Sequence, residues 1–194
     1  MNMTSLFPNG YSVLAAIKEP QDFDGVPGIE LPFFDLFGGE VENAGYLKIC
    51  TFNSYLVACF RCFYKEKPID ASTFYGNRVF RGECVELFIG SRNEYYELDV
   101  SPYNVRFFAL IDENGQAIEQ TDLGISTVAK WGDGSYEILY KIPLSKLKRW
   151  EKLYFNAFRV EGICHEERFS RSVWKTDSLL HHVPAAFKRL KFHQ

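Results

Sequence analysis

Acidic residues interrupt two short runs of apolar residues, where a charged side chain is unusual. Glu86 lies inside the run Cys84–Ile89, and Glu97 and Asp99 lie inside the run Tyr95–Val100. Side chains two positions apart on a β-strand point to the same face, so Glu97 and Asp99 are predicted to lie together. Because burying an unpaired charge is costly, each carboxylate needs a cationic partner or a wet cleft.

Two interpretations of these carboxylates remain open from the sequence. Arg159 ends an aromatic strand and provides a guanidinium for an internal salt bridge with Glu86 or Glu97. In the second interpretation, the carboxylates and Arg159 line a concave sheet face and hydrogen-bond the hydroxyl groups of a sugar. Two carboxylates are also the catalytic pair of most glycosidases, but at a defined separation that spacing does not reveal. The chain is also short for a glycosidase with a deep cleft.

Other motifs associated with catalysis or metal binding are weak. Cys59 and Cys62 have CxxC spacing, but residues three apart on a strand point to opposite faces, so their sulfur atoms are not expected to converge. The cysteines are interpreted as reduced core thiols. His165 follows Cys164 but has no Cys or His partner at a usual zinc spacing, which favours a solvated loop. The chain has no nucleophile elbow, phosphate-binding glycine loop or HExxH motif.

Composition and charge are those of an ordinary folded protein with an unusual share of aromatic residues. Of 194 residues, 46% are hydrophobic and 16% are aromatic, a share that suits half-buried strands and stacking surfaces. The net charge of -3 provides no basic surface for nucleic acid or for a membrane. No apolar run approaches the ~20 residues of a membrane helix. Residues 1–20 lack the pattern of a secretory signal, so a complete chain is expected in the cytoplasm.

Short runs of aromatic and β-branched residues, separated by turn residues, dominate the chain. They predict an all-β fold, an antiparallel β-sandwich in a single domain spanning residues 1–194. Within it, residues 1–40 are expected to form an irregular wrap and residues 41–194 the sandwich. Pro143 is predicted to open a short helical turn, one of at most two, that buries Leu147. The predicted strands are Tyr46–Cys50, Tyr55–Tyr64, Cys84–Ile89, Tyr95–Val100, Val105–Ile111, Tyr136–Ile142, Tyr154–Val160 and Phe187–Phe192.

Residues 80–192 contain a series of segments in the order found in the family-9 carbohydrate-binding modules, and the chain resembles these modules and the broader family-9-like group. An acidic-then-apolar strand precedes a Tyr-rich strand. A strand leading into a helical turn, an aromatic strand with an arginine, a Trp-containing segment and a closing strand follow. In this sequence they are Glu83–Ile89, Tyr95–Pro102, Tyr136–Leu147, Phe155–Glu161, the segment around Trp174, and His182–Leu190. The ordered set, rather than any one segment, supports the resemblance.

The resemblance implies a β-sandwich of jelly-roll or immunoglobulin-like type that binds sugars without cleaving them. In sugar-binding members, two tryptophans clamp a terminal sugar ring and a glutamate bonds its hydroxyl groups. Sugar rings stack on aromatic rings through apolar C–H faces, and their hydroxyls select oriented polar groups. By this resemblance Glu86 matches the glutamate, while Phe80 and His181 stand at the tryptophan positions. Asp99 stands at a basic position, and Ser101 at an amide position.

The resulting hypothesis is a carbohydrate site with Trp174 as an additional stacking platform. Trp131 and Trp150 are interpreted as structural residues. Family members also carry structural calcium, which the resemblance implies here without assigning oxygen ligands. The predicted carbohydrate-binding residues are Phe80, Glu86, Glu97, Asp99, Arg159, Trp174, His181 and His182.

The altered clamp positions keep other functions open. A family-9-like scaffold that has lost sugar binding would act as an interaction protein with a protein partner. A glycan-processing enzyme would need two carboxylates that face each other across an open groove.

Overall fold

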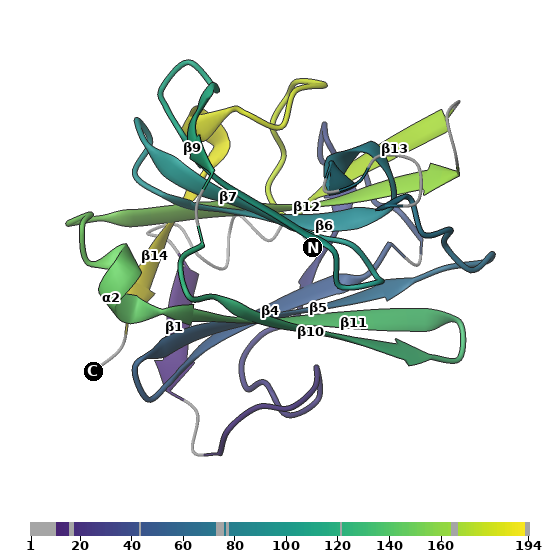
Figure 1. Ribbon diagram of the computed structural model, residues 1–194, viewed down its shortest axis with the longest axis horizontal. Coiled ribbons are helices and arrows are strands. Elements are labelled where there is room, and N and C mark those ends of the chain that lie inside the picture. The colour runs from purple at the N-terminus through teal and green to yellow at the C-terminus, as the bar shows by residue number, and fades with distance from the viewer. Residues whose placement is uncertain are drawn as a thin grey trace.

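The computed structural model describes residues 11–192, except residues 16–17, 43, 73–75, 77, 121 and 164–166. Its strands form two layers that face each other (Figure 1). One layer, called the acidic sheet here, has the strand order β14-β12-β6-β7-β8-β9, with β13 beside β12 and β3 beside β13. The other, called the back sheet, has the order β10-β11-β5-β4, with β2 beside β4.

The described residues form fourteen strands, eight of which match the predicted runs with small shifts at their ends. They are β1 (Tyr11–Ala15), β2 (Leu31–Pro32), β3 (Phe34–Asp35), β4 (Tyr46–Phe52), β5 (Tyr55–Phe63), β6 (Cys84–Gly90), β7 (Tyr95–Val100), β8 (Arg106–Ile111), β9 (Ala117–Gln120), β10 (Ser126–Gly132), β11 (Ser135–Pro143), β12 (Leu153–Ile163), β13 (Glu167–Ser172) and β14 (Lys188–Phe192). Short helices are η2 (Val79–Arg81), α2 (Leu144–Leu147) and η3 (Pro184–Ala186). The predicted fold class, an all-β sandwich with short helical turns, is confirmed.

β1 joins the two sheets through parallel pairing on both of its sides. Its first residues pair with β14 and its last residues pair with β4. Within the range predicted as an irregular wrap, residues 1–40, the structure has three short strands, β1, β2 and β3. Pairing with partners far away in the sequence depends on tertiary context, which a short local pattern does not reveal.

Besides β1, β2 and β3, three further strands lie outside the predicted runs, namely β9, β10 and β13. β10 shows why, because it pairs with β11 on one side only and most of its residues are exposed or half-buried. A strand at a sheet edge that buries little surface has a weak hydrophobic pattern. Trp131 belongs to this strand and packs edge-to-face against Tyr64 and Tyr103, in agreement with the structural role predicted for it.

Both faces of the acidic sheet are buried at its central strands, β6 and β7. Val85 and Leu87 point into the main core between the sheets. On the outer face, Phe88 and Tyr95 pack against Phe187 from the C-terminal segment, with ring centroids 6.1 and 5.1 Å from the Phe187 ring. Figure 1 shows this yellow segment above the acidic sheet, on the side away from the back sheet. The carboxylates of β6 and β7 therefore lie in a covered environment.

The helical turn predicted after Pro143 is present and closes one end of the core. α2 begins directly after this proline, and Leu147 is buried. Trp150 follows it and packs edge-to-face on Tyr96, with ring centroids 4.9 Å apart. This confirms the structural interpretation of Trp150.

A buried ion pair connects the two sheets at one end of the sandwich. The Arg159 guanidinium donates two hydrogen bonds to Glu83 Oε1, at 2.9 and 3.1 Å. It also donates to the carbonyl oxygens of Ala44 and Phe63, which lie beside β4 and at the end of β5. The Tyr136 hydroxyl donates to the same Glu83 oxygen at 2.7 Å. Both charges are therefore paired and hydrogen-bonded, as buried charges must be.

The predicted salt bridge between Arg159 and Glu86 or Glu97 is wrong. Arg159 is in register with Val85 on β6, so its side chain points into the sandwich, whereas the adjacent Glu86 points to the outer face. The closer partner is Glu83 instead, which lies just before β6 and reaches the core-facing side of the sheet, and Glu161 lies 3.4 Å from the same guanidinium.

We expect that Glu83→Ala lowers the free energy of unfolding by about 3–5 kcal/mol, because it removes the carboxylate that accepts two hydrogen bonds from the buried Arg159 guanidinium and leaves only the longer carboxylate contact to Glu161, at 3.4 Å. Asp24→Ala is the matched control, since Asp24 also pairs with an arginine but its side chain is 77% exposed. Urea denaturation at pH 7 measures both. A loss for Glu83→Ala no larger than for Asp24→Ala would contradict the importance of this ion pair.

Candidate ligand-binding site

Four adjacent strands bring one row of side chains to the outer face of the acidic sheet. Phe158 on β12 is paired with Glu86 on β6, Glu86 is paired with Asp99 on β7, and Asp99 is paired with Phe107 on β8. Paired residues in a sheet point to the same face. The two carboxylates therefore lie side by side between two aromatic rings, and Glu97 lies two positions along β7 on the same face.

The two carboxyl groups of β7 are strongly perturbed. Asp99 is fully buried, and neither of its oxygens has a partner at normal hydrogen-bond geometry among the described residues, although hydrogen bonding between the Asp99 and Glu97 carboxyl groups contributes to the pKa shifts of both. Burial, followed by repulsion from Glu97 and Glu86, raises the pKa of Asp99 well above its ordinary value. Burial and repulsion from Glu86 also raise the pKa of Glu97 to about 8. At neutral pH this pair therefore retains protons that ordinary carboxyl groups release.

His181 is the hydrogen-bond partner of Glu86. Its Nδ1 donates to Glu86 Oε2 at 2.6 Å, and its ring stacks on Phe158 with centroids 4.5 Å apart and 7° between the planes. Burial disfavours the charged imidazolium, but attraction to Glu86 and the hydrogen bond outweigh it, so the pKa of His181 is raised. The His181–Glu86 pair thus holds the C-terminal segment on the sheet.

The next residue, His182, lies beside Glu97. Its Nδ1 and the Tyr95 hydroxyl are hydrogen-bonded at 2.8 Å, and its Nε2 lies 3.8 Å from Glu97 Oε2. Burial lowers the pKa of His182, so its neutral form is favoured at neutral pH. The pKa values of the two neighbouring histidines therefore shift in opposite directions, up for His181 and down for His182.

Phe80 lies at the opposite end of the row from His181. It belongs to η2, is half-buried, and packs edge-to-face on Phe107 with centroids 5.4 Å apart. The structure therefore places Phe80 beside one terminal ring of the row and His181 on the other, Phe158. Phe107 and Phe158 were not among the predicted site residues, although their alternation within aromatic strands is a usable signal.

The structure does not bring Arg159 or Trp174 to this face. Arg159 points into the sandwich, and Trp174 is buried in the main core, edge-to-face with Phe155. The predicted site therefore divides into a group on the outer face, formed by six of the eight predicted residues, and these two residues elsewhere.

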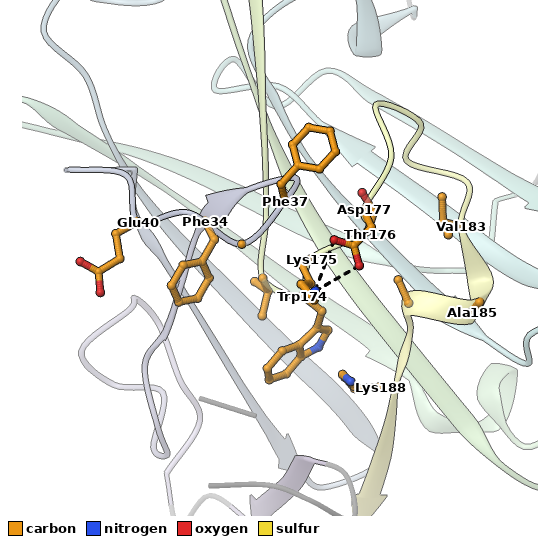
Figure 2. Close-up of a pocket in the computed structure, with 13 residues that line it drawn as sticks. Phe34, Phe37, Glu40, Trp174, Lys175, Thr176, Asp177, Val183, Ala185 and Lys188 are labelled. Atoms are coloured by element: carbon orange, nitrogen blue, oxygen red, sulfur yellow. Dashed lines mark hydrogen bonds and ion pairs between the residues drawn. The ribbon is translucent and has the colours of Figure 1, made fainter. Parts of the chain in front are cut away.

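Trp174 instead lines a separate cavity of about 650 Å³ (Figure 2). The cavity lies between the segment around β3 and the segment that leads from β13 to β14. Its lining residues are Phe34, Phe37, Gly38, Glu40, Val173, Trp174, Lys175, Thr176, Asp177, Val183, Ala185, Ala186 and Lys188.

The cysteines behave as the sequence indicates. Cys50, Cys59, Cys62 and Cys84 are free and buried. Cys62 belongs to the main core and Cys59 to a cluster on the outer face of the back sheet, which confirms that the CxxC sulfurs do not converge. Burial raises the pKa of each of these four thiols, so they are unreactive.

The predictions about metal binding and membrane helices can be compared with the described residues. In the part of the chain that the structure describes, no three His, Cys, Asp or Glu side chains group together as metal ligands, and the implied calcium stays without assigned ligands. Among the same residues, no helix has the length and apolar character needed to cross a membrane. His165, Cys164 and His193 lie outside the described residues.

Comparison with known proteins yields structural neighbours but no sequence match. No protein-family model matches the chain, and no curated protein matches its sequence. A putative carbohydrate-binding protein from Bacteroides uniformis superposes with a TM-score of 0.71 at 14% identity, covering 94% of this chain and 98% of that one. The chain has the fold of the family-9 carbohydrate-binding modules. One such module, from Caldicellulosiruptor kristjanssonii in complex with cellotriose, gives a TM-score of 0.67 at 12% identity, covering 94% and 93% of the two chains.

A second structure of a family-9 module from the same organism, in complex with glucose, gives a TM-score of 0.66 at 13% identity. It covers 94% of this chain and 96% of the other. At these identities the likeness establishes the fold, and the residues that act in this chain must be argued from its own outer face.

The raised pKa of Glu97 predicts a specific pH dependence. A carboxyl group whose pKa is higher in the folded state takes up a proton on folding, so its contribution to stability is fully present below about pH 4.5 and is lost as pH rises through about 8. Glu97→Gln removes this titration, so the variant should gain stability relative to the wild-type protein between pH 6 and pH 9. Thermal unfolding across this range measures it, with the exposed Glu119→Gln as the control. A difference in Tm that does not change with pH would contradict the assignment.

Proposed function

We propose that this protein binds a sugar on the outer face of the acidic sheet and does not cleave it. The observation that supports the proposal is the row in which Glu86 and Asp99 lie between two aromatic rings. It occurs in a fold shared with modules whose structures hold cellotriose and glucose.

In this proposal each group has a role that its chemistry permits. Phe80 and the ring of His181, at the two ends of the row, flank the sugar and contact its C–H faces. Glu86 accepts hydrogen bonds from the sugar hydroxyls. Glu97, with a pKa of about 8, retains its proton at neutral pH and donates one to a sugar oxygen.

The charge of the face favours neutral sugars over acidic ones. Its ionisable groups are three carboxyl groups and two histidines, of which His181 is hydrogen-bonded to Glu86 and His182 Nε2 lies 3.8 Å from Glu97 Oε2. A sugar carboxylate would lie beside Glu86 without a lysine or arginine partner in the described site. Repulsion between like charges in a partly desolvated site costs affinity.

The burial and hydrogen bonding of the carboxyl groups are consistent with binding without catalysis. Glycosidases place two carboxyl groups against the scissile bond. Here Asp99 has no exposed surface, and Glu86 is engaged by His181. These groups suit the recognition of hydroxyls better than proton transfer to a leaving group.

We expect isothermal titration calorimetry to detect binding of a neutral glucan oligosaccharide such as cellotriose, and weaker or no binding of glucuronate. Glu86→Gln should weaken the affinity by about tenfold or more, because a hydrogen bond to a charged group is lost. Glu119→Gln, on the exposed side of β9, is the control and should bind as the wild-type protein does. A well-folded wild-type protein that binds nothing on a broad glycan array would contradict the proposal.

A specific observation supports an interaction protein as the second candidate function. Leu179 and Leu180 are 79% and 68% exposed on the segment that covers the acidic sheet. Adjacent exposed leucines are a common feature of protein-interaction surfaces. A blank glycan array, together with loss of a partner in a Leu179→Ser, Leu180→Ser double variant, would favour this function.

A further inference from the structure

The cavity lined by Trp174 is built from two segments that the structure ties together. β3 pairs with β13, and the backbone N–H groups of Thr176 and Asp177 both donate to the carbonyl oxygen of Leu36, at 2.9 and 3.1 Å. In Figure 2, Phe34 and Phe37 lie on one side of the cavity, and Val183 and Ala185 lie on the other. Its volume of about 650 Å³ is within the range of small-molecule sites.

The indole of Trp174 leaves a buried hydrogen-bond donor unused. The residue is 5% exposed, and its Nε1 has no hydrogen-bond partner among the described residues. Asn156 fixes its backbone on both sides, donating to its carbonyl oxygen at 2.9 Å and accepting from its N–H at 3.1 Å. In Figure 2 the indole nitrogen lies on the side of the ring nearer Ala185 and Lys188. A buried unpaired donor is costly, so an acceptor supplied by a ligand would be favourable.

The charges around the cavity balance. Lys175 pairs with Asp177 at 3.2 Å, and the remaining charged residues are one acid, Glu40, and one base, Lys188. An anionic or a cationic ligand gains no net electrostatic preference from this set. A purely apolar ligand would leave the Trp174 N–H unpaired. A neutral molecule with hydroxyl groups and an apolar face matches both the donor and the aromatic walls.

We propose that this cavity is a second carbohydrate site, which takes a neutral sugar unit between Phe34, Phe37 and Trp174. A hydroxyl oxygen of the sugar accepts the Trp174 Nε1–H, and other hydroxyls reach Glu40 or Lys188. The site is distinct from the outer face, because no residue of the Phe158–Glu86–Asp99–Phe107 row lines the cavity.

The segment between Asp177 and Phe187 connects the two sites. Its middle residues, His181 and His182, contact the acidic sheet, while Asp177 and Val183 line the cavity. A sugar bound in the cavity would thus stabilise the conformation in which the histidines lie on the outer face.

The test is an NMR titration of uniformly ¹⁵N-labelled protein with cellobiose and with maltose. The chain has three tryptophans, so the indole N–H region holds three signals, and Trp174→Phe identifies one of them. We expect the Trp174 signal to move in a saturable manner and the Trp131 and Trp150 signals to stay in place. An unmoved Trp174 signal with both sugars would overturn the proposal.

Two further variants separate this site from the outer face. Phe37→Ala removes a ring that is 58% exposed, so the fold should persist while the affinity reported by Trp174 falls roughly fivefold. Ile118→Ala, at a residue 56% exposed on β9, is the matched control and should change nothing. In Glu86→Gln the response of Trp174 should persist. Its disappearance there would show that the sugar binds only at the outer face, which would also overturn the proposal.

Discussion

The carboxyl groups of β6 and β7 lie on a sheet face that is withdrawn from water, and the rest of the site depends on how their charge is accommodated. Glu86 is hydrogen-bonded to His181 Nδ1 at 2.6 Å. Glu97 and Asp99 instead favour the protonated state, because burial and mutual repulsion raise their pKa values. Ionised carboxylates without partners would favour a face that is open to water. Because Glu86 is hydrogen-bonded to His181 and the other two carboxyl groups favour the protonated state, the C-terminal segment can cover this face of the sheet.

The two acidic features of the molecule therefore have separate roles. The Glu83–Arg159 pair lies inside the sandwich and bonds to backbone carbonyls beside both β4 and β5, so it fixes the relation of the two sheets. Glu86, three residues later, points to the opposite face and pairs with a half-buried histidine near solvent. Residues so close in sequence reach different environments because side chains alternate along a strand. Glu83 thus contributes to stability, whereas Glu86 is the carboxylate that our proposal assigns to the ligand.

The local sequence pattern predicted many of the strands of the sandwich, but it predicted few of the contacts between strands that are distant in the sequence. Alternation within Tyr95–Val100 placed Glu97 and Asp99 on one face, and the structure keeps them there. The partner of Arg159 could not be assigned in this way, because it depends on the register of β12 against β6. The cavity beside Trp174 was also beyond local reasoning. Its walls bring Phe34 next to a segment about 140 residues later, a proximity that only the β3–β13 pairing creates.

The most direct test of the central claim is a crystal structure of the protein grown with cellotriose. The account predicts electron density for a sugar ring over the outer face of the acidic sheet, within hydrogen-bond distance of Glu86 and between Phe80 and His181. Well-ordered protein with this face unoccupied at saturating cellotriose, or with the sugar bound only elsewhere, would contradict it.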